Sequence, residues 1–137
     1  LVLKLMILIL ISSLLLAACA PGAESITGEE LTAVAEWSAP IAEGILSGMK
    51  NADHNTFVLN FNDQMKSAFT PGEFDAMLND LGGRLGAYDS HELSGAERVE
   101  GGFIAVFYRT RFEKASVTMR VIHEEAEPYL VAGLWFR

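Results

Sequence analysis

Cysteine and basic residues are scarce in this sequence. Its 137 residues include one cysteine, Cys19, and ten Lys+Arg against 18 Asp+Glu. Because one thiol cannot form an internal disulfide, the stability of the fold must come from its core. The formal net charge of −8 gives a surface that repels the phosphates of nucleic acids, so we expect no nucleic-acid partner.

Signatures of catalysis and of metal binding are also missing. The histidines His54, His91 and His123 have no paired ligand near them in the sequence, so we expect no metal. Asp89, Ser90 and His91 are adjacent, but neighbours on a strand point to opposite faces and cannot form a catalytic triad. No glycine-rich phosphate loop opens a helix. We therefore expect no cofactor and assign no catalytic residue.

A hydrophobic run opens the sequence. Between residues 2 and 18 the single charge is Lys4. The apolar stretch is about a dozen residues long, whereas a membrane-spanning helix needs about 20. Residues 1–18 therefore predict a cleaved export signal rather than a permanent anchor. Without Lys4, nine basic residues remain against 18 acidic ones, a net charge of −9.

The end of this run, Leu16-Ala17-Ala18-Cys19, resembles the bacterial lipobox. The resemblance implies that a signal peptidase recognises Leu16, Ala17 and Ala18, and that Cys19 carries lipid as the first residue of the mature chain. Several acyl chains on one cysteine hold a protein durably at a membrane. We expect a lipid anchor on the extracytoplasmic side of a bacterial membrane, in the cell envelope. The alternatives are an ordinary secretory signal with a chance cysteine and an uncleaved helix.

Residues 19–26 are predicted to form a lipidated tether, and residues 27–137 a single domain whose first half is helical. Thr27 and Thr70 each precede a glutamate by three residues, which is typical of helix N-caps. Apolar residues at helical spacing predict a helix up to residue 49, kinked or split at Pro40 with Ser38 as a second cap. A second short helix is predicted over residues 53–69, and a third from Thr70 to Gly82-Gly83 or Gly86.

The second half of the domain changes to a period of two. Strands are predicted over residues 88–99, 103–112, 117–123 and 129–136, with a bulge near Ser94-Gly95 and turns at 100–102 and 124–128. Helices followed by an antiparallel meander indicate an α+β fold. We expect three N-terminal helices packed on one face of a curved four-stranded antiparallel sheet.

Three segments together resemble the bacterial domain-of-unknown-function family 3887. They are FNDQMKSAFTPGEFDAMLNDLGGRLGAYDS, FYRTRFEKASVTMRVI and YLVAGLWF. The element order is also similar to the cone-shaped fold of the nuclear-transport-factor-two-like superfamily. The resemblance extends roughly over residues 45–136 and implies the fold, but it brings no catalytic residues with it.

The function that we expect is that of a lipid-anchored accessory or small-ligand-binding protein without catalytic activity. Its ligand would occupy an apolar cone between the helices and the sheet. The predicted pocket-lining residues are Trp37, Phe61, Tyr108, Met119 and Trp135. One alternative is a small isomerase- or dehydratase-like enzyme that uses the cone. Its candidate residues are Asp63, Asp75, Tyr88 and Tyr108.

A third alternative is an interaction or dimerisation module that uses the open face of the sheet. If residues 113–116 form a turn, Phe112 pairs with Val117 and Arg109 with Arg120. Alternation then places Tyr108 on the core face, and Arg109, Arg111 and Arg120 on the open face. We expect Glu92 or Glu97 to supply a counter-charge, or else an acidic envelope partner or a second copy of the domain.

Overall fold

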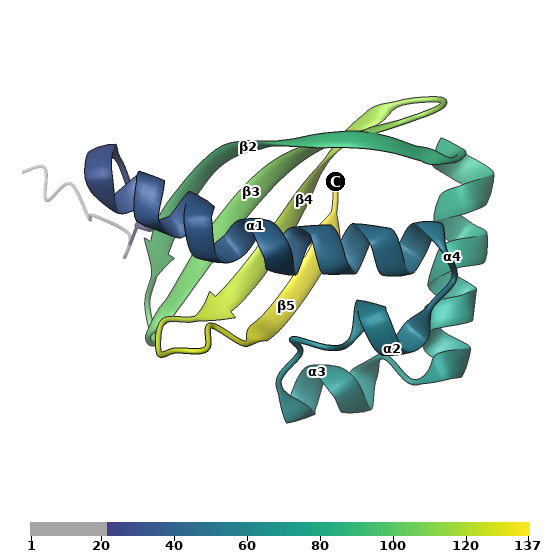
Figure 1. The fold of residues 1–137 in the computed structure, drawn as a ribbon, viewed down its shortest axis with the longest axis horizontal. Helices are drawn as coiled ribbons and strands as arrows, with labels where there is room; N and C mark the ends of the chain where they lie inside the picture. Colours follow the sequence, from purple (N-terminus) through teal and green to yellow (C-terminus); the bar gives the residue numbers. More distant parts are fainter. Residues whose placement is uncertain (1–21) are drawn as a thin grey trace, which may run out of the picture.

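The computed structural model describes residues 22–137, and Figure 1 shows the long first helix lying across a single sheet, with the shorter helices gathered at one end of it. The helices are α1 (Gly28–Lys50), α2 (His54–Phe57), α3 (Asp63–Ala68) and α4 (Pro71–Leu85). The strands are β1 (Glu24–Ser25), β2 (Tyr88–Val99), β3 (Phe103–Phe112), β4 (Ser116–Glu124) and β5 (Val131–Phe136). All neighbours in the order β1-β2-β3-β4-β5 are antiparallel.

The α+β class is confirmed, with five strands instead of the expected four. The extra strand is β1, which pairs Glu24 with Arg98 and Ser25 with Glu97 of β2. The next residue, Ile26, is buried in the core and its backbone N–H donates to the carbonyl of Ala96. The last residues of the predicted tether therefore belong to the folded domain, because their backbone completes the edge of the sheet.

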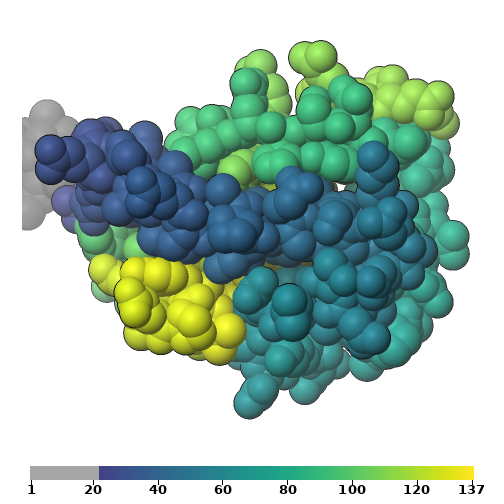
Figure 2. Space-filling model, viewed as in Figure 1, coloured from purple at the N-terminus to yellow at the C-terminus, as the bar shows by residue number. Residues whose placement is uncertain are grey.

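Helix α1 lies across the sheet and is one helix of 23 residues, so of the two outcomes expected at Pro40, a kink or a split, the split is wrong. The side chain of Ser38, expected to cap a second helix, is instead buried and bonded to Tyr108 of β3. Figure 2 shows α1 passing between the β2 side of the molecule and the C-terminal segment. Packing on both sides holds the helix together where proline removes one backbone hydrogen bond.

The helix predicted over residues 53–69 is in fact two, α2 and α3. Between them the backbone of Asn60 and Asn62 pairs with Val131 of β5, and Phe61 forms a parallel bridge to the same residue. The side chain of Asn62 then caps α3 by accepting from the N–H of Met65. Pairing with the sheet edge thus overrides the helical spacing of the phenylalanines.

The two predicted threonine caps differ. Thr70 accepts from the N–H of Glu73 at 3.4 Å, which confirms this cap. Thr27 occupies the cap position of α1 but its side chain makes no cap hydrogen bond, so this part of the prediction is wrong. Gly28 has φ +61°, which turns the chain at the helix start, and Glu30 pairs with Arg98 instead of returning to the backbone.

The β3–β4 hairpin is two residues out of the expected register. Arg109 lies opposite Thr118 and Arg120 opposite Phe107, so the predicted pairing of the two arginines is wrong. The hairpin closes at Phe112, because the next two residues bond to the end of α4 instead. The N–H of Glu113 donates to the carbonyl of Ala87, just after α4, and the N–H of Lys114 donates to the carbonyl of Leu85, the last residue of α4. A shift of two residues leaves each side chain on its predicted face. The predicted bulge next to Gly95 is confirmed.

The core lies between the helices and the face of the sheet that carries Tyr108. On β3 and β4 this face is formed by the buried residues Val106, Tyr108, Thr110, Phe112, Met119 and Val121. The helices contribute Val34, Ile41, Ile45, Leu46, Phe57, Phe61, Phe74 and Leu81. The opposite face, which carries Arg109 and Arg111, is the open face of the sheet.

Candidate functional site

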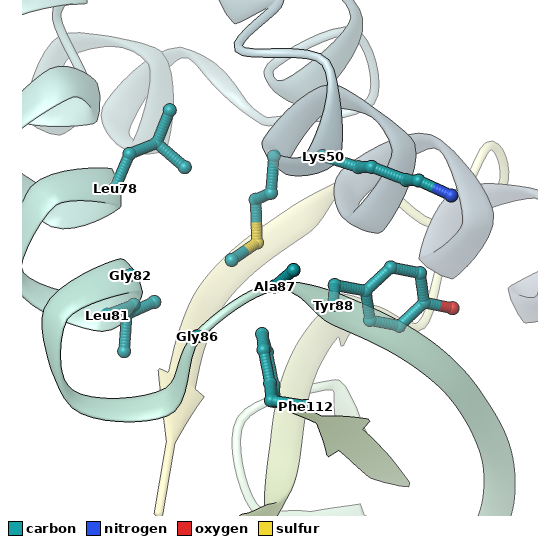
Figure 3. A pocket seen from close by; sticks show the side chains of 9 residues that line it. Lys50, Leu78, Leu81, Gly82, Gly86, Ala87, Tyr88 and Phe112 are labelled. Carbon is teal, nitrogen blue, oxygen red and sulfur yellow. The ribbon is translucent and has the colours of Figure 1, made fainter. Parts of the chain in front are cut away.

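A pocket of about 200 Å³ lies where the end of α1, the end of α4 and the start of β2 meet. Figure 3 shows Leu78 and Leu81 of α4 on one side of it and Phe112 of β3 below. The whole lining is Met49, Lys50, Leu78, Leu81, Gly82, Gly86, Ala87, Tyr88 and Phe112. Its walls are mostly apolar, as expected of a site for a small organic molecule.

Small residues create this space. Gly82 is helical, and a Cβ placed on it would meet no atom within 4 Å. Gly86 ends α4 with φ +77°, and its backbone N–H donates to the carbonyl of Gly82. A Cβ on Gly86 would lie 2.9 Å from the side chain of Glu113, so this tight turn requires glycine. The chain thus passes from helix to strand without a large side chain to fill the hollow.

The polar edge of the pocket is formed by Lys50 and Tyr88, which extend to the same side, away from the two leucines (Figure 3). The hydroxyl of Tyr88 lies 2.5 Å from Nδ1 of His91, and Nε2 of His91 lies 3.8 Å from a carboxylate oxygen of Glu43. Burial, reinforced by the negative charges of Glu43 and Asp89, raises the pKa of Tyr88. The phenol therefore stays protonated at neutral pH and donates to His91 or to a bound acceptor.

The predicted cone is filled by side chains at its centre. Phe61, Tyr108 and Met119, predicted to line a pocket, are all packed in the core. The hydroxyl of Tyr108 lies 2.6 Å from Oγ of Ser38, and burial raises the pKa of Tyr108. The apolar pocket is thus displaced from the centre of the cone to the end where α1 and α4 meet.

The two tryptophans lie elsewhere. Trp37 stacks on Tyr129 with ring centroids 4.1 Å apart and lines a second pocket, of about 250 Å³, beside Arg98. Trp135 was expected in the pocket wall, but it lies on the open face and is 42% exposed. A bulge at the start of β5 changes which side chains of this strand face the core. Strand alternation alone cannot locate such a bulge.

His123 is the most strongly buried titratable group in the described part of the chain. It is 1% exposed, and its Nδ1 lies 2.8 Å from the carbonyl oxygen of Tyr129, to which it must donate. Desolvation lowers the pKa of His123 to about 4, so the imidazole is neutral at physiological pH. Trp37 meets the ring edge-on at 4.8 Å. These contacts enclose the imidazole and indicate a structural role.

The remaining enzyme candidates do not assemble into a site. Asp63 and Asp75 are exposed at the starts of α3 and α4. A ring nitrogen of His54 lies 2.6 Å from the carbonyl oxygen of Phe69. Within residues 22–137 no group of three His, Cys, Asp or Glu side chains is placed to hold a metal ion.

On the open face, Arg109 lies 3.8 Å from Glu92, the counter-charge expected from β2. Arg120 lies between two aromatic rings, 5.9 Å from the centroid of Phe107 and 5.4 Å from that of Trp135. Arg111 is exposed next to Arg109 on the same strand face. The structure thus brings the three predicted arginines together on one surface.

The predicted lipobox residues Leu16, Ala17, Ala18 and Cys19 lie outside the described residues. Within the described range, the helices lack the combination of length and apolarity that crossing a bilayer requires.

Sequence reasoning missed most of the pocket lining. It gave Gly82-Gly83 or Gly86 as the end of this helix, and α4 continues through Gly82 and Gly83 and ends at Gly86. Two glycines inside a helix, followed by Gly86-Ala87, were the available sign of a hollow. The positions of Met49 and Lys50 depend on how α1 crosses α4, which the local pattern does not contain.

One family model matches this chain over residues 42–127, and its description is "Protein of unknown function (DUF3887)". Neither the curated proteins nor the solved structures contain a match.

Proposed function

Because this chain belongs to the DUF3887 family, whose description assigns no activity, we propose its function from its own geometry. We propose a lipid-anchored, extracytoplasmic protein that binds a small amphipathic molecule without transforming it. Cys19 would carry the lipid, after removal of residues 1–18. We further propose that the fold is of the nuclear-transport-factor-two-like type, because a long helix lies across a meandering sheet and the pocket opens at one end.

The observation that carries the ligand proposal is the division of the pocket into an apolar part and a polar edge. Met49, Leu81 and Phe112 would enclose the apolar part of the ligand. The hydroxyl of Tyr88 and the ammonium of Lys50 would bind its polar group, which must accept hydrogen bonds. A pocket of about 200 Å³ is smaller than the roughly 300–1,000 Å³ of drug-sized sites, so a short alkyl chain or one aromatic ring fits best.

A matched pair of variants tests this proposal with hexanol and hexanoate as probes. Gly82→Leu would place a side chain in the pocket, whereas Gly83→Leu adds the same side chain one residue further along α4, outside the lining. A Cβ at either position meets nothing within 4 Å. We expect calorimetric binding of a probe in wild type and Gly83→Leu, and at least a tenfold loss in Gly82→Leu. Equal affinity in the two variants would place the probe elsewhere.

A second candidate function rests on the chain of contacts from Glu43 through His91 to Tyr88. A carboxylate, an imidazole and a phenol in this order can move a proton to or from a ligand in the pocket. Tyr88 would act as a general acid, because its raised pKa keeps it protonated. The test is whether the protein converts a carbonyl compound bound in the pocket. If wild type converts the compound and Tyr88→Phe binds it without converting it, the enzyme function is favoured over the binding function.

A further inference from the structure

Thr118 on β4 is surrounded by three arginines of the open face. Arg109 of β3 lies directly opposite it on one side. On the other side, Thr118 and Arg137 exchange both backbone hydrogen bonds, at 2.7 and 3.0 Å, so Arg137 continues the ladder beyond β5. Arg120 follows two residues along β4 and therefore points to the same face. We call Arg109, Arg111, Thr118, Arg120, Trp135 and Arg137 the Thr118 face.

The spacing of a sheet brings these cations within reach of one bound group. Directly opposed residues have Cβ atoms about 4.5–5.5 Å apart, and residues two apart on a strand are separated by about 7 Å. The long side chains of Arg109, Arg120 and Arg137 can therefore approach an anion placed at the Thr118 hydroxyl. Arg111 lies in the next row, opposite Ser116.

This charge is largely uncompensated within the described residues. The side chain of Arg109 is 66% exposed, and Glu92 is its one ion-pair partner there, at 3.8 Å. Residues 22–137 provide no ion pair for Arg111, Arg120 or Arg137. By contrast, Arg98 contacts both Glu30 and Glu125, and Arg84 contacts Asp80. A cationic surface of this kind on a protein of net charge −8 attracts carboxylates selectively.

An apolar row borders the cations. Phe107, Arg120 and Trp135 lie side by side across β3, β4 and β5. A Cβ on Gly133 would lie 2.5 Å from two ring atoms of Trp135, so the absence of that Cβ allows the indole to lean over the backbone. Trp135 remains 42% exposed. Exposed tryptophan beside arginine is the composition that dominates binding energy in protein interfaces.

We propose that the Thr118 face binds an acidic segment of a partner polypeptide. A carboxylate of the segment lies at Thr118 among Arg109, Arg120 and Arg137, and an apolar side chain packs on Trp135. The segment must carry both an acidic and an apolar side chain, because the face offers cations and an indole next to each other. This site lies on the face of the sheet opposite the pocket, and its existence does not depend on the ligand proposed for that pocket.

The test uses the full chain in phosphatidylcholine nanodiscs, with Trp37→Phe so that Trp135 is the one fluorescent tryptophan. The probe is a synthetic peptide that alternates glutamate with leucine. We expect saturable changes in Trp135 fluorescence. Arg120→Ser/Arg137→Ser should weaken binding about tenfold, because each exposed ion pair contributes a modest amount. Lys66→Ser/Arg84→Ser removes the same charge from α3 and α4 and should leave the affinity unchanged.

Four results would overturn the proposal. The first is the absence of saturable binding, and the second is equal weakening by both double variants. The third is equal binding of a peptide in which glutamine replaces glutamate. The fourth is a change in Trp135 fluorescence without peptide. In phosphatidylglycerol nanodiscs, such a change would mean that anionic lipid occupies the face. In discs that hold two copies, it would mean that a second copy of the chain occupies it.

Discussion

Oγ of Ser38 lies 2.6 Å from the hydroxyl of Tyr108, and both groups are buried. This hydrogen bond joins the middle of α1 to β3 in the centre of the core. Removing one partner leaves the other buried and unpaired, which typically costs about 1–3 kcal/mol. We expect Ser38→Ala and Tyr108→Phe each to lower the free energy of unfolding by this amount.

The double variant Ser38→Ala/Tyr108→Phe should cost less than the sum of the two single changes, because it removes both polar groups. Urea denaturation of the four proteins measures the coupling. Strict additivity would mean that the two hydroxyls do not depend on each other.

The second prediction concerns pH and His123. Its pKa falls from an ordinary 6.5 to about 4 in the folded protein, so folding favours the neutral imidazole. The corresponding stability is complete above pH 6.5 and is lost as the pH falls toward 4, by about 3 kcal/mol. Urea midpoints should therefore drop more steeply over this range in wild type than in His123→Gln, whose amide can still donate to Tyr129. Parallel pH profiles would contradict the burial of a neutral His123.

The third prediction separates the two threonines at helix starts. Thr70→Ala removes a side-chain cap and should lower the free energy of unfolding by about 1 kcal/mol. Thr27→Ala should have a much smaller effect, because the Thr27 side chain makes no cap hydrogen bond. The urea midpoints of the two variants measure this difference. A larger loss of stability in Thr27→Ala than in Thr70→Ala would contradict the assignment of Thr70 as the side-chain cap.

The fourth prediction tests the lipid anchor. Wild-type chain expressed in a bacterium should incorporate labelled fatty acid and be shortened at Cys19, whereas Cys19→Ala should remain an unlabelled precursor. Ser25→Ala, a change in the exposed β1, serves as a control that should still be labelled. If the wild type takes up no label, the lipid anchor proposed for this protein is wrong.

Much of the fold is encoded in local patterns that the sequence displays. Residues 106–112 alternate between buried and more exposed side chains, and the structure places them in the strand β3. Gly86, with its positive φ, ends α4 as a helix-terminating glycine should. The faces assigned to Tyr108 and Arg109 are also correct, because alternation survives a shift of two residues.

The features that escaped prediction depend on contacts between distant segments. The break between α2 and α3 arises from pairing with Val131, about 70 positions further along the chain. The hairpin register depends on the bonds that hold Glu113 and Lys114 against the end of α4. The pocket depends on the crossing of α1 and α4, so its lining could not be assembled from hydrophobic periodicity.

The most direct test of the binding function is the position of a bound probe relative to Met49. Met49 is 8% exposed, and its side chain forms part of the apolar wall. With the methionine methyl groups labelled for NMR, titration with hexanol or hexanoate should shift the Met49 signal to saturation in wild type and in Gly83→Leu, but not in Gly82→Leu. A probe that binds while the Met49 signal stays unchanged, or that shifts it equally in Gly82→Leu, would contradict the proposed binding function.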